Sequence, residues 1–364
     1  MTSDSFTIDP DITRAETLPA PVYASPQWYA RLTERVLART WHMLAHTSEL
    51  PAGESVLPRV LLPGALDEPC VLTRDADGAV RVLSNVCTHR GAVLVEETAS
   101  LRAMRCRYHG RRFALDGAFI SMPEFEQARD FPRPCDNLSV VPHGVLGPLI
   151  FASANPAMPW DEVTRPVLDR MGFLDLASLQ FDSATSRDYN VTANWMLYCD
   201  NFLEGFHIPF VHAALNQVLD YSSYRTELFP WGSLQVGIAE EGAVAFDLPA
   251  DHPDAGQRVA AFYFFLFPST MLNFYPWGLS INLVQPIAAG RTGVRFLSYV
   301  RDATLRAGSA GDGLHDVELE DEAVVESVQR GMRSRFYTRG RYSPTREAAV
   351  HHFHRTLAAM VPGG

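Results

Sequence analysis

Three hydrophobic patterns succeed one another in the first 170 residues of the chain. Apolar residues recur at helical spacing after Ser25-Pro26, which predicts a helix within residues 25–44, because Ser is a good N-cap and Pro a good first helical residue. From about residue 55 the apolar positions alternate, and turn signals at 75–78 and at Asp116-Gly117 predict two β-hairpins. A proline-rich segment at 154–166 then predicts a linker.

Helix and strand patterns mix beyond about residue 180. The stretch at 194–212 predicts a helix interrupted at Pro209, and residues 232–300 have the pattern of strands. The apolar window at 259–279 is long enough for a membrane span, but its prolines and aromatic residues favour two buried strands with a turn between them. After the strands we expect a mobile Gly-Ser surface loop at 306–313. Two amphipathic helices are then predicted, at 316–332 and at 347–360.

The composition is that of a globular protein with more than one core. The 364 residues are 47% hydrophobic and 20% charged, and a chain of this length usually divides into two domains. The formal net charge of −11 argues against nucleic acid and against an anionic membrane surface as partners, because both require a basic face. We therefore expect no nucleic-acid partner and no membrane attachment.

The cysteine count points to a reducing compartment. Five cysteines are an odd number, and in a chain this long they do not suit the dense disulfide framework of a small secreted protein. The N-terminal residues are polar and acidic, without the basic start and apolar run of a signal peptide. We expect a cytoplasmic protein in which any special pair of cysteines serves metal chemistry.

Two loops each offer one sulfur and one imidazole. Cys87 and His89 are one residue apart, and Cys106 and His109 are two residues apart. A tetrahedral zinc site is the simplest alternative, but zinc fingers usually keep two cysteines in one arm and two histidines in the other. One cysteine and one histidine in each arm suit a Rieske [2Fe–2S] cluster, in which one iron takes both cysteines and the other both histidines.

A second pair of histidines is a candidate site for a mononuclear metal. His207 and His212 are five residues apart, which on a regular helix leaves the side chains ~140° apart. A shared ion therefore requires a kink between them, and Pro209 lies there. Two histidines and one carboxylate form the facial triad of non-haem Fe(II) enzymes. The carboxylate could come from any of three acids further along the chain, namely Asp312, Asp316 and Asp321. The alternative to a metal site is that the two histidines are unrelated.

The chain resembles the α subunits of Rieske non-haem iron oxygenases over nearly its whole length. The motifs "NVCTHRG", "CRYHG" and the following "LDG" turn are similar to the Rieske ferredoxin fold, although Arg111 stands where many relatives have tryptophan. The stretches "CDNFLEGFHIPFVH" and "LEDEAVVESVQRGMRSRFYTRGRYS" are most similar to the group of choline, carnitine and glycine betaine monooxygenases.

This resemblance implies an α+β protein with two domains. The expected parts are an N-terminal helical segment at 1–45 that packs with the catalytic domain, an all-β Rieske [2Fe–2S] domain at 46–155, and a catalytic domain at 156–364. The catalytic domain would have the helix-grip (START/Bet v1-like) fold, with helices on an antiparallel sheet.

The resemblance also implies roles for individual residues. The family's iron-binding aspartate falls at Asp321, which would bind Fe(II) with His207 and His212. Glu204 occupies the place of an acid that bridges the two metal sites, from His207 of its own chain to His109 of a neighbour. Such a bridge orients both imidazoles, and it implies a head-to-tail homotrimer.

The implied activity is that of a terminal oxygenase. Electrons from NAD(P)H would reach the chain through a separate reductase or ferredoxin, because the sequence contains no G-x-G-x-x-G unit. With O2 the enzyme would hydroxylate a C–H bond of a small molecule, either a quaternary ammonium or N-methyl compound or, as the alternative, an aromatic ring. A Rieske electron carrier or redox sensor without catalytic iron is the alternative from another class.

Two weaker patterns complete the set. Aromatic residues in the strands could form a cage for a trimethylammonium group, although core packing explains most of them equally well; they are Phe262, Phe264, Phe274, Tyr275 and Trp277. Three histidines near the chain's end lack a matching carboxylate pattern, and we assign them to a helix surface; they are His351, His352 and His354.

Overall fold

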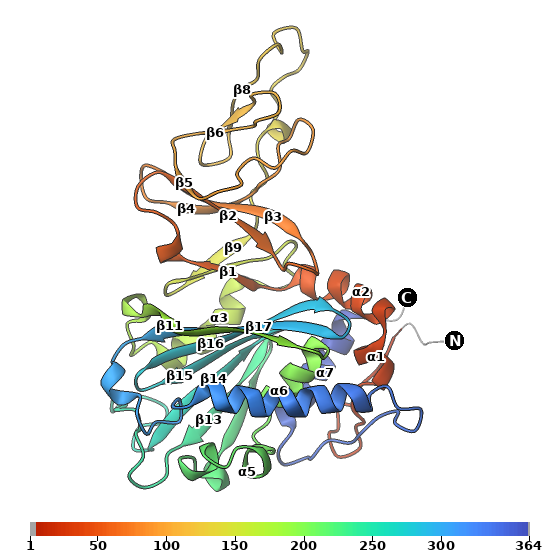
Figure 1. The fold of residues 1–364 in the computed structure, drawn as a ribbon, viewed down its shortest axis with the longest axis vertical. Helices are drawn as coiled ribbons and strands as arrows, with labels where there is room; N and C mark the ends of the chain where they lie inside the picture. Colours follow the sequence, from red (N-terminus) through yellow and green to blue (C-terminus); the bar gives the residue numbers. More distant parts are fainter. Residues whose placement is uncertain (1–4, 363–364) are drawn as a thin grey trace. The chain divides into compact units, whose positions relative to one another are not determined.

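The structure, a computed structural model, describes residues 5–362 (Figure 1). The chain divides into two compact units. The smaller unit consists of residues 38–157, and the larger unit combines the residues up to Leu37 with those from Met158 onward. The N-terminal helical segment therefore belongs with the part of the chain from Met158 onward rather than with the segment that follows it.

The smaller unit is built from three short antiparallel sheets. Their strand orders are β1-β10-β9, β4-β3-β2-β5 and β6-β7-β8. The strands are β1 (His42–His46), β2 (Ser55–Leu61), β3 (Glu68–Arg74), β4 (Val80–Ser84), β5 (Ala99–Ser100), β6 (Met104–Arg105), β7 (Arg112–Phe113), β8 (Phe119–Ser121), β9 (His143–Leu146) and β10 (Leu149–Ala152). Both expected hairpins are present, one between β3 and β4 and the other between β7 and β8.

The larger unit is an antiparallel sheet of seven strands covered by helices. The strand order is β11-β17-β16-β15-β14-β13-β12. The strands are β11 (Gln180–Val191), β12 (Arg225–Phe229), β13 (Gly232–Ile238), β14 (Val259–Leu266), β15 (Thr270–Tyr275), β16 (Gly278–Ala288) and β17 (Arg291–Val300). The helices are α1 (Ala20–Ala24), α2 (Pro26–Arg35), α3 (Trp160–Met171), α4 (Trp195–Phe202), α5 (Ile208–Val211), α6 (Leu314–Gly331) and α7 (Ala348–Met360). Figure 1 shows α6, drawn in blue, crossing the strands.

The long apolar window forms two strands, as the prolines within it predict. Most of its residues lie in β14 and β15, which pair antiparallel and are almost entirely buried in the sheet, and its last two residues begin β16. Within residues 5–362, no helix is long and apolar enough to cross a membrane.

Two local predictions are wrong. The proline-rich segment is not only a linker, because α3 begins inside it at Trp160 and continues through Pro166. Acidic residues in its first turn and buried Val163, Val167 and Met171 stabilise this helix. The segment at 306–313 is not a surface loop throughout, because Ser309 to Gly311 are buried and Gly311 packs against an indole ring.

Candidate functional site

The two loops of the smaller unit have the same backbone geometry. In the first, the Gly91 N–H donates to the Cys87 carbonyl at 3.0 Å, and in the second the Gly110 N–H donates to the Cys106 carbonyl at 3.0 Å. Both glycines have positive φ, 72° and 75°, which a residue with a side chain rarely adopts. Each cysteine N–H also donates at 2.8 Å to a carbonyl on the far side of its own loop.

These loops bring like ligands together. Cys87 and Cys106 are each 2% exposed, and their thiols are close enough to hydrogen-bond. The rings of His89 and His109 lie 4.7 Å apart between centroids at an angle of 72°. Two sulfurs therefore face one another, as do two imidazoles, and this donor set fits a two-iron cluster with one iron at each pair.

Arg111 directly follows the second loop and is buried. Its side chain is 2% exposed, and its Nη2 donates to the Asp136 carboxylate at 2.8 Å. The guanidinium also lies 5.0–5.6 Å from the ring centroids of Phe113, Phe119 and Phe131. The hydrogen bond from Arg111 is the main reason why the pKa of Asp136 lies below its ordinary value. A buried ion pair, Arg111 with Asp136, therefore lies beside the loop that carries Cys106 and His109.

In the larger unit, the helix break that the sequence predicts at Pro209 lies before His207 instead. Helix α4 ends at Phe202, and Pro209 does not interrupt a helix but sits in the first turn of α5, where a missing N–H costs nothing. His207 is the N-cap of this short helix and His212 its C-cap, with φ −110° and ψ 78°. The two imidazole rings lie 5.0 Å apart between centroids, so the ~140° separation expected on a regular helix does not keep them apart here.

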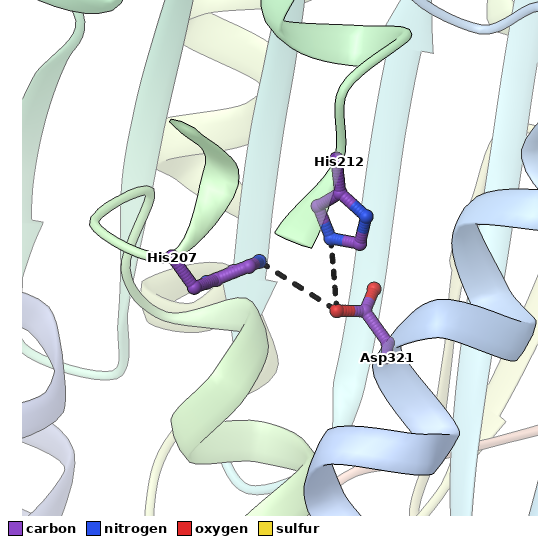
Figure 2. Close-up of side chains that lie close together, drawn as sticks. All are labelled: His207, His212 and Asp321. Carbon is purple, nitrogen blue, oxygen red and sulfur yellow. Dashed lines mark hydrogen bonds and ion pairs between the residues drawn. The ribbon is translucent and has the colours of Figure 1, made fainter. Parts of the chain in front are cut away.

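Asp321 of α6 completes a cluster with these two histidines (Figure 2). One ligand atom from each residue lies within 4.8 Å of the others. Asp321 Oδ1 is 3.0 Å from His212 Nε2 and 3.6 Å from His207 Nε2, and it accepts a hydrogen bond from Asn201 at 2.6 Å. Of the other candidate acids, Asp316 is exposed in the first turn of α6, and Asp312 is exposed and accepts from Gly308 N–H. Neither belongs to the cluster.

Two further carboxylates orient the imidazoles. Glu204 contacts His207 Nδ1 at 2.8 Å and also accepts from the His207 backbone N–H at 3.0 Å. Glu320 contacts His212 Nδ1 at 2.7 Å. With each Nδ1 held by a carboxylate, both Nε2 atoms point at Asp321, which is the arrangement of metal-binding histidines in proteins.

The electrostatics of the cluster also suit a cation. Burial of His212 disfavours its charged form, but hydrogen bonds from the ring to the Asp321 and Glu320 carboxylates, together with their negative charge, outweigh this effect, so the pKa of the imidazole is raised. The carboxylates that attract a proton to this ring would equally attract a divalent metal ion. Two imidazoles and one carboxylate that face a common point fit Fe(II) with open coordination positions.

A cavity of about 100 Å³ lies against this cluster. Its charged side chains are all carboxylates apart from the two histidines, and no Lys or Arg lines it among the described residues. The lining residues are Tyr198, Asn201, Phe202, Glu204, His207, Ile208, His212, Leu215, Tyr224, Gln235, Tyr263, Asn273, Tyr275, Asn282, Phe296, Ala310, Leu314, Val317, Glu318 and Asp321.

The sheet presents polar side chains to this cavity. Gln235, Tyr263 and Asn273 are direct neighbours across β13, β14 and β15, so they share one face. Of the five aromatic residues expected as a cage, only Tyr275 lines the cavity, and the other four are buried elsewhere in the core. Sequence reasoning missed Tyr224 and Tyr263. For Tyr263 the available signal was a polar residue within an apolar strand, whereas Tyr224 lies outside the strands and carries no such signal.

The histidines of α7 are not a surface feature. His351 and His354 are buried, and His354 is 2.8 Å from the Asp200 carboxylate and 2.7 Å from the Tyr342 hydroxyl. Apolar spacing placed these rings in the interior, where each finds a hydrogen-bond partner. Among the described residues, these histidines belong to no metal-binding group.

Family models match both parts of the chain. The model of the Rieske [2Fe-2S] domain covers residues 40–132, and that of the ring hydroxylating alpha subunit (catalytic domain) covers residues 179–363. The chain belongs to the ring-hydroxylating α-subunit family. As a member of this family it is a Rieske non-haem iron oxygenase, an oxidoreductase with a Rieske cluster and a mononuclear iron. Such oxygenases act on a small molecule with O2 and with electrons from a partner protein.

Relatives align over almost the whole chain. Choline monooxygenase of Arabidopsis thaliana is 29% identical over 94% of this chain and 82% of its own length. The carnitine monooxygenase oxygenase subunit of Escherichia coli K12 is 27% identical over 98% of this chain and 96% of its own.

Solved structures share the fold of the chain. The quaternary ammonium Rieske monooxygenase CntA with L-carnitine has a TM-score of 0.75 and 22% identity over 97% of both chains. Naphthalene 1,2-dioxygenase from Rhodococcus sp. has a TM-score of 0.75 and 19% identity over 94% of this chain and 93% of its own.

Proposed function

We propose that this oxygenase hydroxylates a C–H bond of a quaternary ammonium or N-methyl compound, choline- or betaine-like. The observation that carries the proposal is the cavity beside the His-His-Asp cluster, which has carboxylates and tyrosines in its wall and no Arg among its described lining residues. A cation is stabilised by such a wall, whereas an aromatic acid is repelled by it.

We assign the metal ligands as follows. Cys87 and Cys106 hold one iron of the Rieske cluster, and His89 and His109 hold the other. His207, His212 and Asp321 hold the mononuclear iron. The pairing of like ligands and the convergence of both Nε2 atoms on Asp321 support this assignment. We keep the expected domains 46–155 and 156–364 for the two sites, but residues 38–45 go with the smaller unit rather than with the N-terminal segment that packs on the catalytic domain.

Glu204 holds the ring of His207 and, in our proposal, also reaches His109 of a neighbouring chain. Its contacts with His207 through both the ring and the backbone fix the imidazole in position. A bridge between chains makes the site complete only in an oligomer, for which a head-to-tail trimer is the simplest closed form. We place the protein in the cytoplasm, which keeps thiols such as Cys70 and Cys199 reduced.

The overall reaction consumes one O2, two electrons and two protons for each C–H bond. One oxygen atom enters the substrate and the other leaves as water. Bound iron supplies the activation of O2, and the chain's residues position the substrate and the ligands. A hydroxylated N-methyl group would break down to formaldehyde and the demethylated amine, and choline would give an aldehyde hydrate.

Two competing functions make different demands on the molecule. An electron carrier without catalytic iron has no need of three ligands oriented by two further carboxylates. An oxygenase for aromatic acids has no need of an acidic cavity. We therefore favour the oxygenase of cationic substrates over both.

Turnover with purified protein tests the proposal. The enzyme, reduced through a reductase and NADH, is offered choline, carnitine, γ-butyrobetaine and glycine betaine, together with benzoate and naphthalene. We expect O2 consumption coupled to product with at least one quaternary compound and with neither aromatic one. Coupled turnover of an aromatic compound alone would disprove the proposed substrate class, and two irons per chain instead of three would support the carrier.

A further inference from the structure

Glu318 is an ionisable residue of the cavity wall that the proposed function does not yet use. The other two carboxylates of the wall are Asp321, assigned to the iron, and Glu204, which orients a ligand. Glu318 lies one helical turn before Asp321 on α6 and is 1% exposed. A carboxyl group so deeply buried is rare unless it is paired or serves a ligand.

A chain of hydrogen-bond donors ends at Glu318. Asn273 donates to Asn282 at 2.9 Å, and Asn282 donates to the Tyr198 hydroxyl at 3.2 Å. Tyr198 in turn donates to Glu318 Oε2 at 2.5 Å. Because every donor points the same way, the chain stabilises negative charge on Glu318.

No counter-charge faces this carboxyl group within the described part of the chain. Its Oε1 is buried and accepts no hydrogen bond from a donor there, and its other close neighbour is a second acid, Glu322. Burial, followed by the charges of Asp321 and Glu322, raises the pKa of Glu318 well above its ordinary value. The free energy lost by burying these acids would be recovered by a cation in the cavity.

The same cavity has the aromatic surfaces that such a cation requires. The ring centroids of Tyr224 and Tyr263 are 6.4 Å apart, and those of Tyr263 and Tyr275 are 5.9 Å apart. A quaternary ammonium group has no N–H to donate, so only charge and ring faces can recognise it. Tyrosines supply the ring faces, and Glu318 is placed to supply the charge.

We propose that Glu318 is the specificity residue that selects a quaternary ammonium head over a neutral group of the same shape. This inference rests on the proposed function, because it assigns a role within the same substrate cavity. It predicts that the loss of one negative charge at residue 318 weakens binding of cations only.

Calorimetric binding of tetramethylammonium to the iron-loaded enzyme is the first test. Glu318→Gln keeps an acceptor for Tyr198 but removes the charge, and we expect its Kd to rise by about tenfold. Glu318→Asp keeps the charge and should recover part of the affinity. Glu326→Gln is the matched control, because this acid lies on the same helix outside the cavity wall, and its Kd should stay within about twofold of the wild-type value.

A neutral isostere separates charge from shape. We expect the KM for choline to rise about tenfold in Glu318→Gln. The inhibition constant of 3,3-dimethylbutan-1-ol, the uncharged carbon analogue of choline, should be unchanged. An unchanged Kd for tetramethylammonium, or equal losses for choline and the alcohol, would overturn the role of Glu318. Iron content and circular dichroism identify a variant that has merely lost its fold. If the wild-type enzyme turned over no quaternary compound at all, the proposed function itself would fail, whatever the variants do.

Discussion

The two metal-binding regions of this chain are assembled in different ways. In the smaller unit, all four candidate ligands lie within 23 consecutive residues, and two similar loops bring like ligands together. In the larger unit, the third ligand is more than 100 residues from the first two and lies on another helix. The first region depends on local turns, whereas the second depends on how α6 packs over the sheet and α4.

The two regions also differ in what surrounds the ligands. In the larger unit, His207 and His212 are each held by a carboxylate, from Glu204 and Glu320 respectively. The loops of the smaller unit lie beside a buried ion pair, Arg111 and Asp136. The anionic surroundings in the larger unit suit a ferrous ion and a cationic substrate. In the smaller unit, a cation near the cluster favours acceptance of an electron.

Removal of a ligand of the mononuclear iron should have the largest effect, and it should show that the two metal sites are independent. His212→Ala should lower the iron content from three to two per chain and reduce turnover by ~10³-fold or more, since the ion loses one of three protein ligands. The visible spectrum of the Rieske cluster should be unchanged, because its ligands lie in the other unit. Metal analysis and spectroscopy check both points, and a lost cluster spectrum would contradict the independence of the two sites.

Glu204 tests the link between the two regions. Glu204→Gln keeps a hydrogen-bonding group at His207 but removes the charge, and we expect turnover to fall by about 10- to 100-fold. Iron content and substrate Kd should stay close to those of the wild type. Single-turnover experiments with a pre-reduced cluster should locate the loss in electron transfer, and normal oxidation of the cluster would refute the bridging role.

The ion pair in the smaller unit should tune the cluster without affecting the other site. Arg111→Gln removes a buried positive charge, which disfavours the reduced cluster, so its reduction potential should fall by on the order of tens of millivolts. Asp136→Asn leaves the arginine uncompensated, and the potential should rise by a similar amount. Redox titration followed by electron paramagnetic resonance measures both. Shifts of the same sign would show that packing rather than charge is responsible.

The smallest effect should come from the loop glycines. Alanine at either position is strained because φ is positive, with an expected cost of ~1 kcal/mol in unfolding free energy. Gly110→Ala and Gly91→Ala should cost about the same, because a Cβ at residue 110 makes only ordinary van der Waals contacts with Pro123 and Arg105 at 3.4–3.5 Å, and one at residue 91 meets nothing within 4 Å. Denaturant melts measure both costs, and a much larger loss at residue 110 would show that its contacts, rather than its backbone conformation, are responsible.

The sequence by itself determined much of this protein. The spacing of Cys87, His89, Cys106 and His109 indicated a two-iron cluster, because short loops have few conformations and their ligands are neighbours in the chain. Hydrophobic periodicity predicted the hairpins, the buried pair β14 and β15, and the helix α6, because solvent exclusion acts on each element through its own face.

Only the tertiary structure decided the rest. Sequence periodicity left Asp312, Asp316 and Asp321 as alternatives, and it could not find the cavity wall formed by Tyr224, Tyr263 and Glu318. These residues meet because separate elements pack together, and which face of α6 turns inward depends on the whole sheet beneath it. The same reason accounts for the errors at α3 and α7, where burial against distant elements overrode the local signals of proline and histidine.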